Sequence, residues 1–395
     1  MSWKDYDLFQ PTEEHQMLRS MVAEFVQEEV EPQAEEFDRK EEFNLDLFKK
    51  LGDLGLLGIT VPEEYGGAGL DALAAVIVHE ELSSSDPGLC LAYLAHSILT
   101  ANNLAINGGE ELKKRVLPYL CSGEWVGCMA MSEPDAGTDV LAMRTEAQLV
   151  GQQYVINGRK MWITNGTLDE KKTPADCVLL YARTGEKDGR PLISTFLVEK
   201  GHKGYSVGQK IRGKTGMRAS NTAELVFEQC EVPQENLIGE EGASLKHMMR
   251  NLEIERLTLA AMSLGIARRC LQVMSQYAKE RKAFGKPISY FGQIQRHIGE
   301  SYAEYQAARS YIYETARTYN MTASGQRLNS DGVKLFTSTV AKNIADRAIQ
   351  VLGGYGYVSE YVVERLWRDS KLLEIGGGTV EAHQKNITRD FLKTL

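Results

Sequence analysis

The sequence predicts an α+β protein with a helical N-terminal domain (residues 1–124), a central antiparallel β domain (125–241) and a helical C-terminal domain (242–395). Apolar residues recur at helical spacing in the first and last parts of the chain. Short β-branched runs separated by turn residues fill the middle. The length of 395 residues is enough for two or three domains, each with its own core.

The N-terminal domain begins with a predicted amphipathic helix. Pro11 and Thr12 are typical of a helix start. The apolar residues that follow share one helical face, and they are Met17, Leu18, Met21, Val22, Phe25 and Val26. Three glycines predict a loop over residues 62–69, after which Asp71 opens a second apolar helix. Asp86-Pro87-Gly88 interrupts the next helical stretch.

The pattern changes near Trp125 to short extended runs. Asn157-Gly158 predicts a tight type I′ hairpin turn, because both positions tolerate positive φ. Further strands are predicted over residues 177–182, 193–198 and 222–227. Helical periodicity returns near Gly242 and predicts long helices over residues 245–280, 293–319 and 331–352.

Composition excludes several classes of protein. The chain has 45 basic and 54 acidic residues, a net charge of −9, which argues against a nucleic-acid binder. Its six cysteines form no C-x-x-C pair and no His run has metal-ligand spacing, so we expect no metal site. No apolar run approaching a membrane span of about 18 residues is expected. The first residues lack signal or transit character, which predicts a cytoplasmic protein.

Three segments are dense in residues that carry chemistry, although each has an ordinary interpretation when taken alone. Residues 128–139 (CMAMSEPDAGTD) are compatible with a loop between a helix and a strand. Residues 281–285 (RKAFG) are compatible with the end of a helix, and residues 350–357 (QVLGGYGY) with a glycine helix cap. The last segment does not match the G-x-G-x-x-G pattern of Rossmann dinucleotide sites.

Taken together, in this order and at these separations, the segments resemble the acyl-CoA dehydrogenase family. The two most specific motifs are residues 131–139 and residues 350–371, which include Arg368-Asp369. The resemblance covers nearly the whole chain and implies a C-terminal four-helix bundle and an FAD cofactor. It also implies an acyl-CoA substrate, an electron-transferring flavoprotein as electron acceptor, and a homotetramer that is a dimer of dimers. For a mature chain from a eukaryote, it extends the expected location to the mitochondrial matrix.

The resemblance also implies a set of FAD contacts. Trp162 is expected to cover the flavin ring and the Thr164 hydroxyl to reach its N5 edge, with Met131 and Ser132 nearby. Arg281 and Phe284 match residues that hold pyrophosphate and adenine across the dimer, a role that suits the planar guanidinium. The remaining cofactor positions are Gln350, Gly353, Gly354, Thr379 and Glu381. Gln293 is a candidate that requires a backbone shift, because Gly292 separates it from Phe291 where the family pattern has Phe-Gln.

Most of the family has its catalytic base in a Glu-Gly-Thr segment near the C-terminus, but this chain has Gly377 at that position. The Gly377 N–H can still donate to the thioester oxygen. One branch of the family, which includes isovaleryl-CoA dehydrogenases, carries the base on a bundle helix, and Glu255 matches that position. Met248, Leu252, Leu259 and Met262 share its helical face, where a carboxylate is costly unless it is paired or functional.

Alternatives to this assignment stay open in the sequence. Glu255 can instead form a salt bridge with an Arg of the bundle. Glu374 is a rival base three residues before Gly377. Glu253 is expected to form an ordinary ion pair with Arg256.

The substrate-site residues predict a short branched or cyclic acyl group. Gly376 replaces a Tyr that narrows the pocket of straight-chain enzymes in the family. Tyr93 and Leu94 (with Ala95) match the pocket floor, although ordinary helix packing explains them equally well. Thr138 matches a contact near CoA, and Arg256 is expected beside the substrate. Two other functions remain possible on this scaffold: a flavin oxidase or monooxygenase, and a non-catalytic protein that binds FAD and acyl-CoA.

Overall fold

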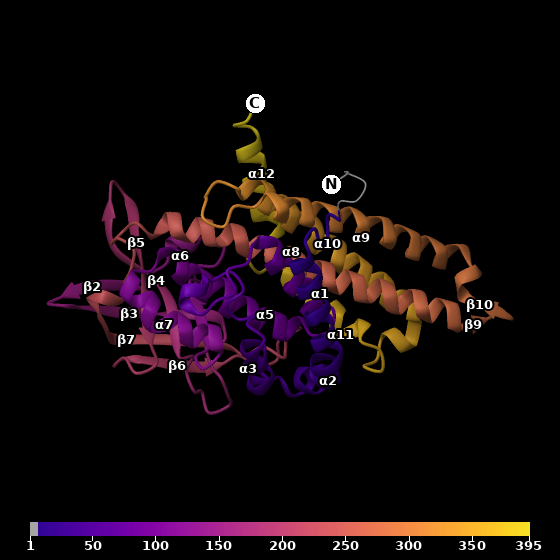
Figure 1. Cartoon of the computed structure of the whole chain (residues 1–395), viewed down its shortest axis with the longest axis horizontal. Coiled ribbons are helices and arrows are strands. Elements are labelled where there is room, and N and C mark those ends of the chain that lie inside the picture. Colours follow the sequence, from indigo (N-terminus) through magenta and orange to yellow (C-terminus); the bar gives the residue numbers. More distant parts are fainter. Residues whose placement is uncertain (1–6) are drawn as a thin grey trace.

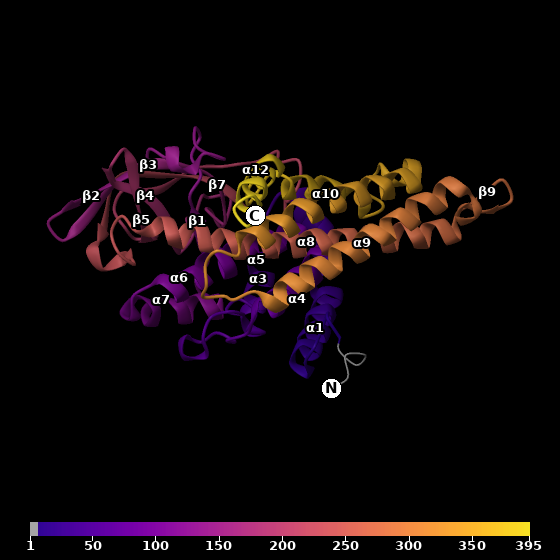
Figure 2. The same cartoon turned by 90° about the horizontal axis from the view of Figure 1, so that it is seen from above.

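The computed structural model describes residues 7–395, so the prediction made from the first seven residues falls, except for Asp7, outside the described residues. A β sheet occupies one end of the molecule, and long C-terminal helices run from it toward the other end (Figure 1). The N-terminal helices lie along one side of the longest helix, α8 (Figure 2). The helix–sheet–helix order predicted from the sequence is confirmed.

The N-terminal helices start where the sequence predicts. The Thr12 hydroxyl accepts from the His15 N–H at 3.2 Å, and Asp71 and Asp86 cap the next apolar helices in the same way. Short π-helical turns at Val26–Val30 and Ser97–Asn102 continue two of these helices. The helices are α1 (Glu13–Phe25), α2 (Glu31–Lys40), α3 (Leu45–Asp53), α4 (Ala72–Ser83), α5 (Pro87–His96), α6 (Asn103–Asn107) and α7 (Glu110–Ser122).

One helical run is long and apolar enough, by length and composition, to cross a membrane. It covers Pro87–Asn107 with a mean hydropathy of 1.4, so the expectation that no run approaches this length is wrong. The run is 94% buried inside the protein. Packing against the surrounding helices accounts for its apolar character, and a single buried run of this kind is weak evidence for a membrane span.

The central sheet is mixed, with strand order β6-β7-β3-β2-β4-β5-β8 and β1 paired to β4. Most pairs are antiparallel, but β1–β4 and β2–β4 are parallel, so the prediction of a purely antiparallel domain is wrong there. No tight turn connects either pair, and the local turn chemistry therefore could not reveal their direction. The strands are β1 (Gly127–Ala130), β2 (Glu146–Val150), β3 (Gln153–Thr164), β4 (Cys177–Lys187), β5 (Arg190–Glu199), β6 (Tyr205–Lys210), β7 (Thr222–Pro233) and β8 (Leu237–Ile238).

The predicted hairpin turn at Asn157-Gly158 is also wrong, because both residues lie inside β3. The pairing of β3 with β7 shifts register between Ile156 and Gly158, which is the mark of a β-bulge. Gly158 has φ of +154°, and a Cβ there would lie 2.3 Å from the Thr145 Oγ1 atom. The glycine is therefore required by a close backbone approach rather than by a turn.

The C-terminal domain is built on three long helices, and their extents match the sequence prediction. They pack side by side, and two shorter helices pack on the last of them. A short hairpin, β9 (Lys282–Ala283) and β10 (Lys286–Pro287), projects at the end far from the sheet (Figures 1 and 2). The helices are α8 (Ser244–Glu280), α9 (Gly292–Thr318), α10 (Arg327–Leu352), α11 (Val363–Leu373) and α12 (Val380–Phe391).

A cluster of buried charges joins the N-terminal helices to the bundle. Glu80 on α4 is fully buried and lies 3.3 Å from both Arg19 of α1 and Arg268 of α8, and it also accepts from the Tyr313 hydroxyl of α9. Neighbouring Glu81 pairs with Arg268 at 2.7 Å. Because burying unpaired charge is costly, each member of this cluster holds its partners in place.

Replacing Glu80 with Gln should destabilise the protein, because Arg19 and Arg268 would then share a single carboxylate. We expect the free energy of unfolding to fall by about 3 kcal/mol, measured by denaturant titration. The matched control is Glu36→Gln, which breaks an exposed i,i+4 pair with Lys40 and should change stability by less than about 0.5 kcal/mol. Equal small effects of both variants would contradict this account.

Candidate active site

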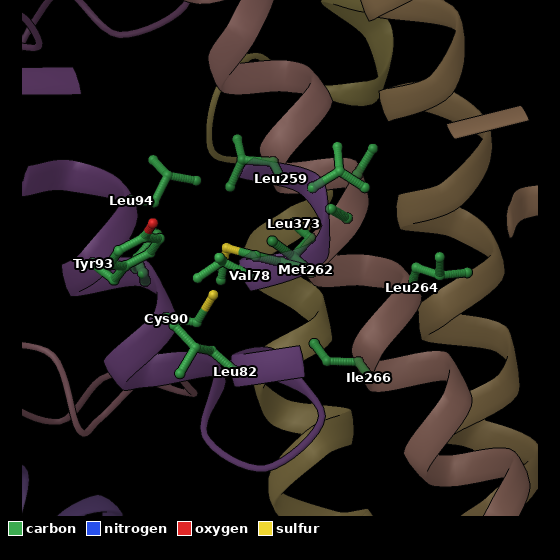
Figure 3. Close-up of a cluster of buried hydrophobic side chains, with 14 of the residues drawn as sticks. Val78, Leu82, Cys90, Tyr93, Leu94, Leu259, Met262, Leu264, Ile266 and Leu373 are labelled. Carbon is green, nitrogen blue, oxygen red and sulfur yellow. The ribbon is translucent and has the colours of Figure 1, made fainter. Parts of the chain in front are cut away.

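Glu255 lies on α8 where this helix passes between the N-terminal helices, the sheet and α10. Its side chain is buried, and the apolar face predicted from the sequence is present: Met248, Leu259 and Met262 are also buried. Figure 3 shows Leu259 and Met262 of α8 converging on side chains of α4 and α5. The Glu255 Oε2 atom has no hydrogen-bond partner, and within residues 7–395 no Lys or Arg forms an ion pair with this carboxylate. The alternative of a structural salt bridge at Glu255 is therefore not supported.

This environment sets the protonation of the carboxyl group. Burial raises the pKa of Glu255 from 4.5 to about 7, partly offset by the positive charges of Arg256 and Lys334. A carboxylate with a pKa near neutrality is a far better proton acceptor than one in water, and it still exists in its charged form at physiological pH. The group therefore has the properties of a general base.

A glycine loop lies directly against Glu255. Gly377 has φ of +68°, and a Cβ built there would lie 3.5 Å from the Glu255 Oε1 atom and 2.3 Å from Leu259 Cδ1. A side chain at position 377 is thus excluded both by backbone conformation and by Leu259. The Gly377 N–H makes no hydrogen bond to the described part of the chain, whereas its carbonyl accepts from Arg256 Nε at 3.1 Å. A free N–H beside a base suits the binding of a developing oxyanion.

Two neighbouring acidic residues have other partners. Glu253 accepts from the backbone N–H groups of Gly325 and Gln326, at 3.2 and 3.1 Å, and it fixes the start of α10. The predicted ion pair of Glu253 with Arg256 is wrong, because Arg256 turns instead to the fully buried Asp331 at 2.8 Å. Glu374, the rival base, pairs with Lys371 at 2.6 Å.

The residues predicted for the flavin lie at the edge of the sheet where β3 ends and where the chain leaves β1. Trp162 is 63% exposed with φ of +65°, and Thr164 ends β3. Ser132 is half-buried and its backbone carbonyl accepts from the Met161 N–H at 2.9 Å, while Met131 packs with Met248 of α8. An exposed Trp beside a hydroxyl at a strand end offers an aromatic face and a hydrogen-bond donor to a planar ring.

The conspicuous motif of residues 131–139 is held by a buried ion pair that sequence reasoning missed. Glu133 accepts from Lys160 Nζ at 2.9 Å and from the N–H groups of Arg144 and Thr145. Both charged side chains are buried, so the pair fastens the 131–145 loop to β3. An acidic residue inside a run of turn formers, with a lysine on a following strand, was the available signal. Thr138, expected near CoA, lies exposed on this loop.

A second group of predicted cofactor residues lies far away, at the hairpin end of α8. Arg281, Phe284, Gly353 and Gly354 line one cavity of about 650 Å³. Phe284 is 95% exposed, and an added Cβ would meet no atom within 4 Å at either glycine. A guanidinium, an exposed ring and open glycine backbone fit the pyrophosphate and adenine of FAD. Gln293 and Gln350 are exposed nearby but do not line this cavity.

Thr379 and Glu381 line a different cavity of about 770 Å³ between α10 and α12. The Thr379 hydroxyl accepts from the Ala382 N–H at 3.2 Å and caps α12. The structure therefore divides the predicted cofactor residues among three places: the sheet edge, this cavity and the hairpin end.

The predicted pocket-floor residues are buried in the core. The Tyr93 hydroxyl donates to the Leu56 carbonyl at 3.0 Å, so the ring faces the N-terminal helices. Leu94 lies on the side nearer Leu259 in Figure 3. For Gly376, the nearest contact of an added Cβ is 3.5 Å, so the site tolerates a side chain there, in contrast to Gly377.

Comparisons with known proteins find relatives of this chain over nearly its whole length. Three family models match the chain: "Acyl-CoA dehydrogenase, N-terminal domain" over residues 12–124, "middle domain" over 128–230 and "C-terminal domain" over 244–392. The mitochondrial isovaleryl-CoA dehydrogenase of Solanum tuberosum is 44% identical, covering 98% of this chain and 92% of that protein. Butyryl-CoA dehydrogenase from Megasphaera elsdenii has a TM-score of 0.91 at 32% identity, covering 99% and 100% of the two chains. An acyl-CoA dehydrogenase from Bacillus anthracis complexed with FAD has a TM-score of 0.90 at 33% identity, covering 100% of this chain and 68% of that one.

The buried carboxylate predicts a pH-dependent stability difference. Glu255 is easier to protonate in the folded chain than in the unfolded chain, so its ionisation destabilises the fold as pH rises from about 4.5 to 7. Glu255→Gln removes that cost, and we expect the variant to exceed the parent in unfolding free energy by about 3 kcal/mol at pH 8. The difference should shrink to less than half at pH 5. Denaturant titrations at both pH values test this, and a difference independent of pH would contradict it.

Proposed function

The chain belongs to the acyl-CoA dehydrogenase family of FAD-dependent oxidoreductases, and we propose that it desaturates a short branched or cyclic acyl-CoA between Cα and Cβ. The single observation that carries this proposal is Glu255, a buried carboxylate beside the Gly377 N–H; within residues 7–395 the carboxylate has no counterion and the N–H has no acceptor. A strongly perturbed carboxyl group next to an oxyanion donor suits removal of a proton α to a carbonyl.

Each residue has a distinct task in this reaction. Glu255 removes the α-proton of the thioester and holds it as a neutral carboxylic acid. The Gly377 N–H donates to the thioester oxygen as negative charge develops there, which lowers the barrier to proton removal. FAD, when held by residues such as Trp162 and Thr164, would supply the acceptor for the hydride that leaves Cβ. The apolar wall of Met248, Leu259 and Met262 excludes water, so the carboxylate stays a strong base until substrate arrives.

The acyl group is proposed from the space at the glycine loop. Gly376 has no side chain to narrow the site, and the substrate named in the isovaleryl-CoA dehydrogenase relative is a branched thioester. A branched or cyclic acyl group fills the width that a Tyr would occupy in an enzyme for straight chains. Leu94 and Leu259 are proposed to border this space.

The proposed assembly is a homotetramer arranged as a dimer of dimers. Arg281 and Phe284 lie on the hairpin at one end of α8, while Trp162 lies at the sheet end (Figure 1). One FAD bridging both groups of residues would draw them from two subunits, which gives the exposed Phe284 a partner. We further propose an electron-transferring flavoprotein as electron acceptor, and the mitochondrial matrix or the cytoplasm as location.

Glu255→Gln should keep FAD and acyl-CoA binding but reduce the rate of flavin reduction by at least about 10³-fold, because the amide cannot accept the proton. Anaerobic stopped-flow absorbance at the visible flavin band measures that rate. The matched control is Glu374→Gln, which removes the rival carboxylate and should leave the rate within about threefold. Rapid reduction in Glu255→Gln would overturn the assignment of the base.

The acyl preference is tested by anaerobic titration with straight, branched and cyclic acyl-CoAs. We expect isovaleryl-CoA or a similar branched or cyclic thioester to bleach the flavin fastest. Gly376→Tyr should shift preference toward straight chains by about 10-fold in kcat/KM, since pocket shape discriminates by 1–3 kcal/mol per methyl-sized group. A yellow protein that no acyl-CoA bleaches would instead indicate an oxidase, a monooxygenase or a non-catalytic flavoprotein.

A further inference from the structure

Next to the glycine loop (residues 376–378) lies a buried cluster of charged side chains that links three helices. Asp331, in the first turns of α10, has no exposed surface. One of its oxygens lies 2.8 Å from Arg256 Nη1 of α8 and 2.9 Å from His383 Nδ1 of α12. Arg256 and His383 are also buried. Burying a charged group costs free energy, which its charged and hydrogen-bonded partners must offset.

The cluster holds the loop that carries the free N–H. Three consecutive glycines at 376–378 give the loop little conformational preference of its own. The Gly376 N–H bonds to the Leu372 carbonyl at 2.8 Å, and Arg256 Nε donates to the Gly377 carbonyl at 3.1 Å. A Cβ at Gly378 would touch the His383 ring at 3.0 Å. Of the two hydrogen bonds, the one to Gly377 comes from a residue paired with Asp331, and the His383 ring, also bonded to Asp331, leaves no room for a side chain at position 378.

The same cluster balances charge around the base. Three groups on elements packed against Glu255 act on it or respond to its charge: Arg256 on its own helix, Lys334 on α10 and the Tyr181 hydroxyl on β4. Lys334 is occupied by the Leu373 carbonyl. Burial keeps the pKa of His383 below its ordinary value, so His383 is neutral near pH 7 and the charge of Asp331 is opposed by Arg256. Asp331 therefore balances part of the positive charge of Arg256, which lies next in the chain to the unpaired Glu255.

We propose that Asp331 is a positioning residue for the desaturation: it holds Arg256 against the Gly377 carbonyl and balances part of the charge of Arg256 beside Glu255. Asp331 touches neither the base nor the oxyanion donor, and it acts on both through Arg256. This inference rests on the proposed function, because it assigns Glu255 and Gly377 the roles given above. It explains why Arg256, expected beside the substrate, faces the interior.

The test is Asp331→Asn compared with Asp390→Asn. Asp390 of α12 pairs with Arg327 of α10 at 2.6 Å, so this control removes an Arg–Asp pair between α10 and α12, two of the three helices that the cluster links, without touching the glycine loop. The measured quantities are the flavin reduction rate at saturating acyl-CoA from pH 5.5 to 9, and the acyl-CoA concentration at half saturation.

For Asp331→Asn we expect a fall of about 10- to 100-fold in reduction rate with less than about threefold change in half saturation. The midpoint of the pH profile should move down by about one unit, because an unopposed Arg256 favours the charged form of Glu255. Asp390→Asn should change neither the rate by more than about twofold nor the midpoint. An Asp331→Asn profile that coincides with that of Asp390→Asn would overturn the proposal.

Arg256→Lys tests the hold on the Gly377 carbonyl separately from the charge balance beside Glu255. It also keeps the proposal testable if the Asp331 variant does not fold. Lysine keeps the charge and the pair with Asp331, but it lacks the planar guanidinium that spans Asp331 and the Gly377 carbonyl. We expect a slower reduction with an unchanged pH midpoint, and a rate equal to that of the parent would overturn the positioning role. If no acyl-CoA reduces the parent protein, the proposed function fails first. If acyl-CoA reduces the flavin of the parent protein, and the variants show the same rates and pH midpoints as the parent, only this inference is overturned.

Discussion

An unpaired carboxylate in an apolar helix interface is the constraint on which the rest of the site depends. Glu255 lies among Met248, Leu259 and Met262. Its ionisation is costly there because the apolar side chains do not stabilise the negative charge as hydrating water would. The fold tolerates this cost because α8 is held on all sides, by α4, α9 and α10 and by the sheet. A loosely packed helix would admit water, and the carboxyl group would return to an ordinary acidity.

Three other buried carboxylates of the chain each have a positively charged partner. Glu80 faces Arg19 and Arg268, Glu133 faces Lys160, and Asp331 faces Arg256. These pairs tie together segments that are distant in sequence, so they fix domains and loops relative to one another. Glu255 differs from them in having no counterion among residues 7–395, although a guanidinium lies one residue away. Buried Glu253, Asp86 and Asp369 also have no ion pair within these residues, but each accepts from backbone N–H groups. What distinguishes Glu255 is that, besides having no counterion, its Oε2 atom has no hydrogen-bond donor there either.

The glycine at position 377 has a steric consequence as well as a chemical one. Leu259, one turn after Glu255, occupies the space that a side chain at 377 would need. The leucine at position 259 and a side chain at position 377 therefore cannot both be accommodated. In this chain the proposed base comes from the helix, the loop contributes only backbone, and an added Cβ at Gly376 would meet its nearest atom at 3.5 Å. The glycines of the loop are therefore linked both to the position of the proposed base on the helix and to the width of the proposed acyl site.

The sequence by itself determined the order of helical and sheet regions, the extents of the long helices, and the apolar face on which Glu255 lies, because these depend on periodicity over a few turns. The helix starts at Thr12, Asp71 and Asp86 were equally local, since each cap bonds within its own first turn. The tertiary structure alone decided the parallel pairing of β1 with β4, the bulge at Gly158 and the partners of Glu253 and Arg256. Each of these depends on a group distant in sequence, such as β7, Gly325 or Asp331, and no local pattern records which distant partner a strand or a charge will meet.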